Sequence, residues 1–509
     1  MLRYVVGPGR RFPCLSNYAP ACNFARSGSD SSRQAERSIG FAALRKSVKP
    51  EELLLHRLKG HEFLQFQRSL GLVPTGGGDV NEMYIAAANC KNKQLLKECK
   101  GKPNLAWFKA WDDLAERTFQ AGMQRLADQS NPAGAASALL RACNYSRTSA
   151  FFLRGHVEYE EEKREAYLRT DQAFRSAAAV LKPSKLEEVR IPLNGSDTNT
   201  NGHCKITLQG YFGRASFTPN GFEHSPLLIA SSGYDGDIAE TFFYVRPFIE
   251  KFGFNILIFD GPGQGVEAVT RKTKLIPNWE IVLKAVIDYA EQNLKEKGVD
   301  VKRDGLVSYG ISLGGHLNTR AMLHEKRVHC YVLDPINPSM RRAMFEKLPK
   351  KFINDMLDSD ASPDDSTKGL SCFSNFLKTL IEKFMFQALA SRAQVHGIDV
   401  TDKAWLAQFV REAYRFHLDY EELGKATVSM VLCAAENDVV VGDMSKPEKI
   451  MKYFSEEMVT EGKIRVIPFL KSEGAGNHCE GGARELVWER VLDELLPLLG
   501  KEVRKRGQI

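Results

Sequence analysis

Residues 310–314 read Gly-Ile-Ser-Leu-Gly and place a serine between two glycines. An apolar stretch at 306–309 precedes this segment, and a stretch with helical composition follows it. A serine at such a strand-to-helix turn exposes its hydroxyl at the edge of a sheet, and the small neighbours relieve crowding around a strained backbone. The helix N-terminus also favours negative charge that develops nearby. We therefore expect Ser312 to be a nucleophile. The alternative is a glycine-rich junction that only packs.

A serine nucleophile needs a base, and the base needs an acid that orients it. Asp438 follows an apolar run at 427–434, and His478 follows another at 464–469. Both positions are carboxyl ends of predicted strands, where a doubly wound sheet places its site. The chain order serine, acid, histidine also fits a nucleophile at a strand-to-helix turn. We predict a triad of Ser312, Asp438 and His478, with Glu436 and Asp443 as competing acids.

The oxyanion that forms when a serine attacks a carbonyl needs two backbone N–H donors. We expect the first from Leu313, the residue after the nucleophile. We expect the second from Tyr234, in the Ser-Ser-Gly-Tyr-Asp-Gly loop at 231–236 that follows the apolar run 227–230. A plain turn is the alternative for this loop.

Residues 260–265 read Asp-Gly-Pro-Gly-Gln-Gly after another predicted strand. A dinucleotide fingerprint would need glycine where Val266 stands, and Pro262 disfavours a helix here. We interpret the segment as a rigid turn at the mouth of the site. Asp334, at the end of an apolar run at 328–333, points to the same rim or caps the next segment. None of the ten cysteines forms a CxxC pair or a zinc-like cluster, so we expect no cofactor and no metal.

The surrounding elements predict an α/β fold. Residues 189–193 and 205–212 alternate as a hairpin, and later apolar runs alternate with helical segments, which is typical of a parallel sheet covered on both faces. An insertion of helical, polar character interrupts this alternation and indicates a lid. We predict the following divisions: a tail at 1–43, a helical N-terminal region at 44–183, a first core part at 184–340, a lid at 341–423, and a second core part at 424–509.

Charge is concentrated at the N-terminus. The chain has 509 residues and a net charge of +7, and residues 1–50 carry nine Lys or Arg against two acids. The rest is balanced, which argues against a nucleic-acid-binding face. No apolar run is long enough to span a membrane. Residues 1–29 lack acids, so a mitochondrial transit peptide is the alternative to an unstructured tail. Scattered cysteines favour a reducing compartment, and we expect a cytoplasmic protein.

Four segments together resemble one subgroup of the α/β-hydrolase superfamily. They are Arg-Ala-Cys-Asn-Tyr-Ser-Arg-Thr-Ser-Ala-Phe-Phe-Leu at 141–153, Asp-Gly-Pro-Gly-Gln-Gly at 260–265, Gly-Ile-Ser-Leu-Gly-Gly at 310–315 and Glu-Asn-Asp at 436–438. The subgroup includes 2,6-dihydropseudooxynicotine hydrolase, the fermentation–respiration-switch-type esterases and the fungal yellowish-green hydrolases that shorten polyketides. The resemblance covers roughly residues 95–500.

The resemblance implies an α/β-hydrolase fold, a mostly parallel doubly wound sheet with a helical N-terminal region and a helical lid. It implies cleavage of a C–C bond beside a ketone, or of an ester, in a small polyketide-like or other secondary-metabolite substrate, by Ser/Asp/His without a cofactor. Two other interpretations stay open: an acyl transferase or cyclase that uses the same triad, and an inactive hydrolase-fold scaffold. Helical N-terminal regions of this kind often pair subunits, which suggests a homodimer.

Overall fold

The computed structural model describes Leu58 and residues 60–193, 206–270, 273–345, 348–358, 371–384, 386–442 and 446–507. These residues belong to one compact unit, Leu54–Ile509. The expectations for the tail at 1–43, including its targeting role, lie outside the described residues, and so does the competing acid Asp443.

An eight-stranded sheet forms the centre of the fold, with the strand order β1-β2-β4-β3-β5-β6-β7-β8. The strands are β1 (Leu186–Leu193), β2 (Ile206–Gly213), β3 (Leu227–Ser231), β4 (Asn255–Phe259), β5 (Leu306–Ile311), β6 (Cys330–Asp334), β7 (Ser429–Ala435) and β8 (Ile464–Phe469). β2 runs antiparallel to both β1 and β4, and all the other neighbours are parallel. The predicted hairpin and the predicted parallel sheet are both confirmed. β3 pairs with β5 through register positions such as Ser231 and Gly310, which brings their carboxyl ends side by side.

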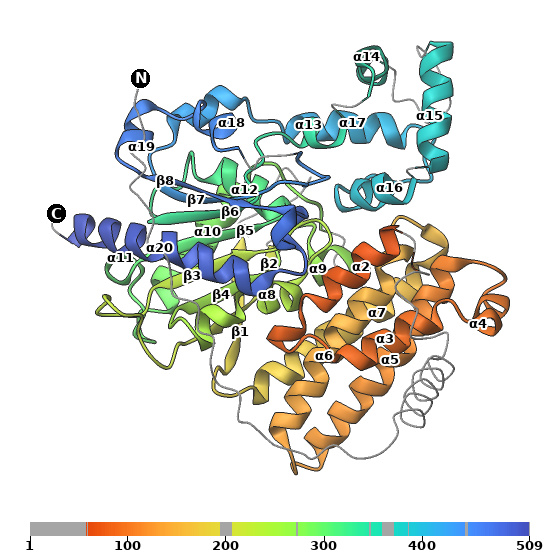
Figure 1. Cartoon of the computed structure of the whole chain (residues 1–509), viewed down its shortest axis with the longest axis horizontal. Helices are drawn as coiled ribbons and strands as arrows, with labels where there is room; N and C mark the ends of the chain where they lie inside the picture. Colours follow the sequence, from red (N-terminus) through yellow and green to blue (C-terminus); the bar gives the residue numbers. More distant parts are fainter. Residues whose placement is uncertain are drawn as a thin grey trace, which may run out of the picture. The chain divides into compact units, whose positions relative to one another are not determined.

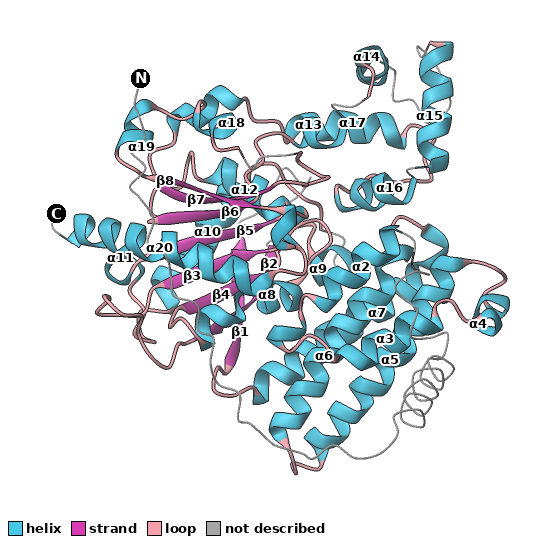
Figure 2. Cartoon of the chain, viewed as in Figure 1, coloured by secondary structure: helices cyan, strands magenta, loops and turns pink. Residues whose placement is uncertain are grey.

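Helices cover both faces of the sheet (Figure 2). Every residue of β3 to β7 is buried, because apolar side chains meet a helical layer above and below. One apolar core packs side chains of the sheet against α8 and α20, and the other packs them against α10 and α12. The core helices are α8 (Ile238–Glu250), α9 (Gly265–Thr270), α10 (Trp279–Asn293), α11 (Val301–Asp304), α12 (Leu313–Ala321), α18 (Glu448–Met451), α19 (Glu456–Thr460) and α20 (Arg484–Gly507).

A bundle of helices precedes the sheet in sequence. Its members are α2 (Gly60–Leu70), α3 (Val80–Asn89), α4 (Lys93–Glu98), α5 (Pro103–Ala127), α6 (Pro132–Ala150) and α7 (Glu160–Val180). Trp107 and Trp111 lie in the apolar core of this bundle with Phe66 and Phe152, so these aromatic side chains are structural. α5, α6 and α7 pack as successive antiparallel neighbours (Figure 1).

A second group of helices interrupts the sheet between β6 and β7 (Figure 1). It comprises α13 (Met340–Phe345), α14 (Lys350–Asp358), α15 (Cys372–Phe384), α16 (Phe386–Val395) and α17 (Trp405–Arg415). Phe352 and Phe409 are fully buried in an apolar cluster that belongs to this insertion alone. The insertion therefore has its own core.

Short 3-10 helices complete the chain at Val73–Thr75 (η2), Phe151–Leu153 (η3), Val157–Tyr159 (η4), Tyr420–Lys425 (η6), Lys471–Glu473 (η7) and His478–Glu480 (η8). The segment between β7 and β8 forms two short helices, α18 and α19, because the Ser455 hydroxyl accepts a hydrogen bond from the N–H of Met458 and caps the second of them. No helix among the described residues is long and apolar enough to cross a membrane.

Candidate active site

Ser312, Asp438 and His478 meet at the carboxyl ends of β5, β7 and β8. Ser312 Oγ lies 2.9 Å from His478 Nε2, and His478 Nδ1 lies 2.7 Å from Asp438 Oδ2. Both distances are hydrogen bonds, so the imidazole links the hydroxyl to the carboxylate. The structure thus brings together the three residues that the sequence placed at strand ends.

The backbone at Ser312 has φ 57° and ψ −117°, a region that side-chain-bearing residues rarely occupy. Such a conformation costs on the order of 1–3 kcal/mol and persists only where its surroundings enforce it. The Ser312 N–H donates to the carbonyl oxygen of Asp334 at 2.6 Å, across the β5–β6 boundary. A Cβ on Gly310 would lie 2.2 Å from Gly314 O, and one on Gly315 would lie 2.2 Å from Pro335 O. The glycines around the serine are therefore a steric requirement of this turn.

Asp438 is almost fully buried, with 1% of its side chain exposed. Its Oδ1 accepts the N–H groups of Val440 at 2.8 Å and Val441 at 3.0 Å, which leaves Oδ2 for the histidine. Glu436 faces elsewhere and accepts the N–H of Lys471 at 2.8 Å. Between these two acids, Asp438 is the partner of His478.

The loop after β3 lies directly against Ser312. A Cβ on Gly233 would lie 2.6 Å from Ser312 Cβ, 2.9 Å from Ser312 Oγ and 3.0 Å from Leu313 N. Leu313 begins α12, so its N–H is one of the donors that a helix N-terminus leaves without an intrahelical acceptor. Tyr234 follows Gly233 and packs partly buried against the apolar core on this side of the sheet. Leu313 and the loop that carries Tyr234 therefore both lie beside Ser312.

The lid insertion holds the Tyr234 side chain. The Tyr234 hydroxyl lies 2.7 Å from His396 Nε2 of the segment that ends α16, and 3.3 Å from Met340 Sδ. Burial lowers the pKa of His396 to about 3 and raises the pKa of Tyr234 well above its usual value, so both groups are neutral at pH 7. His396 could not be predicted from its sequence context, because a lone histidine in a helical insertion has no defined distance to the sheet.

The helical N-terminal region holds the same loop and the start of α8 through buried and partly buried ion pairs. Arg154 lies 2.9 Å from Asp235, and Arg147 lies 3.0 Å from Asp237 at the N-terminus of α8. Glu240 forms ion pairs with both Arg147 and Arg68, and the Arg68 pair measures 2.7 Å. Burial by itself would raise the pKa of Asp235, but arginines led by Arg154 outweigh it and hold the value at about 2. These contacts were not predicted from the sequence, although Arg147 lies within the 141–153 segment and Arg154 directly follows it.

The turn at 260–265 is hydrogen-bonded to the loop that follows β3. Gln264 donates to the Ser232 carbonyl at 2.6 Å, and its side-chain oxygen accepts the Gly261 N–H at 3.0 Å. A short helix, α9, begins at Gly265, although Pro262 was expected to prevent one. Pro262 lies in the turn before the helix starts and so removes none of its hydrogen bonds.

The expectation that Asp334 points to the rim is wrong. Its side chain is fully buried, its Oδ2 accepts the Tyr309 hydroxyl at 3.1 Å, and it faces Glu480 on the interior side of the sheet.

No protein-family model matches the chain. The chain is 28% identical over 311 residues to the 20-hydroxy-prefusarin hydrolase FUS2 of Gibberella moniliformis, which covers 60% of this chain and 67% of that protein. It is 30% identical over 306 residues to the hydrolase LUC6 of a Fusarium species, which covers 60% of this chain and 67% of that protein. The crystal structure of the 2,6-dihydroxy-pseudo-oxynicotine hydrolase superposes with a TM-score of 0.54 at 16% identity, over 84% of this chain and 96% of that one.

The chain belongs to the α/β-hydrolase superfamily. The superfamily and the fold predicted from the motifs are both confirmed. This α/β-hydrolase spans about two thirds of the length of the curated relatives that it matches.

Proposed function

We propose that this α/β-hydrolase uses Ser312, His478 and Asp438 to cleave a C–C bond beside a ketone, or an ester bond, in a polyketide-like or other secondary-metabolite substrate. The observation that carries the proposal is the continuous pair of hydrogen bonds from the Ser312 hydroxyl through His478 to Asp438. It is built on a serine whose backbone is held in a rarely occupied conformation at a strand-to-helix turn.

In this mechanism Ser312 Oγ attacks the substrate carbonyl carbon, and His478 Nε2 takes the hydroxyl proton. Asp438 keeps the Nδ1–H of the imidazole pointed at itself and stabilises the imidazolium that forms. The N–H groups of Leu313 and Tyr234 hold the oxyanion. The neutral Tyr234–His396 pair anchors one of these donors without placing a charge beside it.

Collapse of the tetrahedral adduct breaks the bond to the leaving group. In a β-diketone the electron pair leaves as an enolate, and in an ester it leaves as an alkoxide. His478 returns its proton to either one. Water, activated by the same imidazole, then releases the acid from Ser312. The side chains present supply each proton transfer, so the route itself requires no metal or organic cofactor.

The substrate class is supported by similarity to FUS2, a hydrolase named for 20-hydroxy-prefusarin. The loop that carries Tyr234 is also held from both sides, by the lid through His396 and by the N-terminal helices through Arg154. Residues from two regions outside the sheet therefore hold the loop that lies beside Ser312.

A fluorophosphonate probe and a Ser312→Ala variant test the chemistry without a known substrate. We expect the probe to label Ser312 in the wild-type chain and not in the variant, which should stay folded. Ser216→Ala, at an exposed serine, is the matched control and should label normally. Unchanged labelling of Ser312→Ala, or none of the wild type, would refute the nucleophile. Product masses from extract incubated with active and Ser312→Ala protein then separate hydrolysis, which adds water, from acyl transfer or cyclisation.

A further inference from the structure

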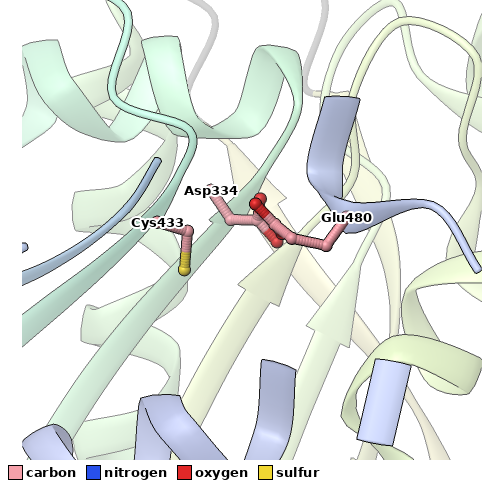
Figure 3. A group of neighbouring side chains, drawn as sticks. All are labelled: Asp334, Cys433 and Glu480. Carbon is pink, nitrogen blue, oxygen red and sulfur yellow. The ribbon is translucent and has the colours of Figure 1, made fainter. Parts of the chain in front are cut away.

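A buried cluster of ionisable side chains lies directly behind the catalytic histidine. Asp334, Cys433 and Glu480 place their polar atoms within 4.8 Å of one another, and Figure 3 shows the two carboxyl groups facing each other. Asp334 is 0% exposed and Glu480 is 1% exposed. Arg484, 2% exposed, places Nη1 3.8 Å from Asp334 Oδ2 and stacks its guanidinium 3.8 Å over the Tyr244 ring.

The charges of this cluster do not balance unless one carboxyl group is neutral. Two carboxylates and one guanidinium would leave a net negative charge in a site without solvent, which is costly. Asp334 Oδ1 and Glu480 Oε2 are also buried and have no hydrogen-bond partner among the described residues, so two ionised carboxylates would leave both oxygens unsatisfied. One proton on the pair removes both problems. A metal ion in its place would lie beside the permanent positive charge of Arg484, so the cluster does not fit a cation.

The pair joins the two halves of the proposed catalytic site. On one side, the Asp334 carbonyl accepts the Ser312 N–H at 2.6 Å and thereby holds the nucleophile turn. On the other side, the same carbonyl accepts the thiol of Cys479 at 3.3 Å, and Cys479 follows His478. Cys479 and Glu480 have φ values of 49° and 47°, so two consecutive side-chain-bearing residues hold a left-handed backbone. Their strain needs an anchor, and the Glu480 carboxyl supplies it from inside the core.

We propose that Glu480 carries a proton that it shares with Asp334, and that this hydrogen bond positions the His478 loop against the Ser312 turn. Glu480 is a positioning residue, because it touches neither the hydroxyl nor the imidazole nitrogens that react. This role rests on the proposed function, since it concerns the same serine and histidine.

The groups that face Glu480 come from several elements. Asp334 on β6 and Asp438 after β7 oppose its ionisation, and Arg484 on α20 favours it. Cys433 on β7, Cys479 and Tyr309 on β5 are neutral, because burial raises the pKa of each well above its usual value. Burial first, and then Asp334, raise the pKa of Glu480 well above that of an exposed glutamate. Alkaline pH would therefore remove the shared proton and drive the two carboxylates apart.

The test compares the rate of fluorophosphonate labelling at Ser312 across pH in matched variants of the full chain. Glu480→Gln keeps a donor to Asp334 but cannot ionise. We expect it to label within about threefold of the wild-type rate at pH 7 and to lose the alkaline decline of the wild type. Asp334→Asn leaves one carboxylate and one amide, and should lose the same decline. Glu480→Ala removes the anchor and should label on the order of 100-fold more slowly, since a displacement near 1 Å at a catalytic group costs about that much.

Glu485→Gln is the matched control, because Glu485 is exposed and lies on the same helix as Arg484. It should keep the wild-type pH profile. A Glu480→Gln protein with the wild-type alkaline decline would overturn the shared proton, and so would a stoichiometric metal ion in the purified chain. Fast labelling of folded Glu480→Ala would overturn the positioning role.

Failure of the proposed function has a different signature. If wild-type Ser312 is not labelled at any pH, chemical unfolding still tests the shared proton. Wild-type stability should fall relative to Glu480→Gln as pH rises above about 4.5, the usual value for glutamate. Parallel stability curves would overturn the shared proton independently of catalysis.

Discussion

Gly233→Ala should separate catalysis from folding in this enzyme. The methyl group would appear 2.6 Å from Ser312 Cβ and 2.9 Å from Ser312 Oγ. Carbon atoms in contact prefer separations of about 3.5–4.0 Å, so the loop or the nucleophile must shift by roughly 1 Å. Gly233 does not have a positive φ, so alanine meets no backbone penalty of its own. The clash therefore falls on the nucleophile rather than on the chain conformation.

A 1 Å displacement here moves the Tyr234 N–H away from the oxyanion, and the methyl group fills the space beside Leu313 N, 3.0 Å away. Loss of one oxyanion donor typically lowers kcat about 10²–10³-fold, or roughly 3–4 kcal/mol of transition-state stabilisation. We expect a loss of this size for Gly233→Ala, with a much smaller change in the free energy of unfolding.

The assay is the hydrolysis rate of a p-nitrophenyl ester together with urea unfolding of the same preparation. Gly60→Ala is the matched control, because a Cβ on Gly60 meets nothing within 4 Å. It should retain wild-type turnover. Gly233→Ala with wild-type turnover would refute the placement of this loop over the nucleophile. Global unfolding of the variant would show that the clash is relieved through the fold instead.

Three other perturbations follow from the same structure. Asp438→Asn should reduce kcat by about 10³–10⁴-fold while the protein stays folded, because the imidazole loses its orienting charge; a tenfold effect in the ester assay would contradict this. Arg147→Ala should lower the free energy of unfolding by about 3–5 kcal/mol, since it leaves buried acids unpaired, and a change under 1 kcal/mol in urea unfolding would contradict the clamp. Burial lowers the pKa of His316 to about 4 and of His396 to about 3, so stability that is full above pH 6.5 should be lost as pH falls toward those values, by up to about 1.4 kcal/mol per pH unit for each histidine. Urea midpoints that stay constant from pH 6.5 to 4 would contradict that reasoning.

Local chemistry explains which parts of the site the sequence could predict. The Gly-Ile-Ser-Leu-Gly turn, with an apolar strand before it, requires its own geometry, so the position of Ser312 followed from neighbouring residues alone. His478 and Asp438 followed from the ends of apolar runs, because parallel strands bring those ends to one edge. Asp438 was also predicted over Glu436, and the coordinates add the physical reason: its carboxylate accepts the N–H groups of Val440 and Val441 and meets His478 with its other oxygen.

Contacts between segments far apart in the chain could not be predicted from the sequence. The insertion of β4 between β2 and β3, and the burial of Asp334 against Glu480, depend on segments far apart in the chain. The Arg147–Asp237 pair depends on how the helical bundle docks, and no pattern within either segment specifies that docking. Local turns and periodicities therefore predicted the helices, the strands and the residues at strand ends. Tertiary packing determined which side chains from distant segments contact one another.

The arginine contacts have a consequence for how this enzyme could be shortened or rearranged. A fragment that starts near β1 would retain the full triad, yet Asp235, Asp237 and Glu240 would lose the guanidinium groups of Arg68, Arg147 and Arg154. Repulsion among these three carboxylates would then loosen the loop at 231–236, which we propose holds the oxyanion. The ribosome makes the helical bundle before the sheet. The arginine side chains of the bundle are therefore present when the segment with Asp235, Asp237 and Glu240 emerges. Competence for turnover is therefore a property of the two regions together, and the sheet cannot be transplanted as a self-sufficient catalytic module.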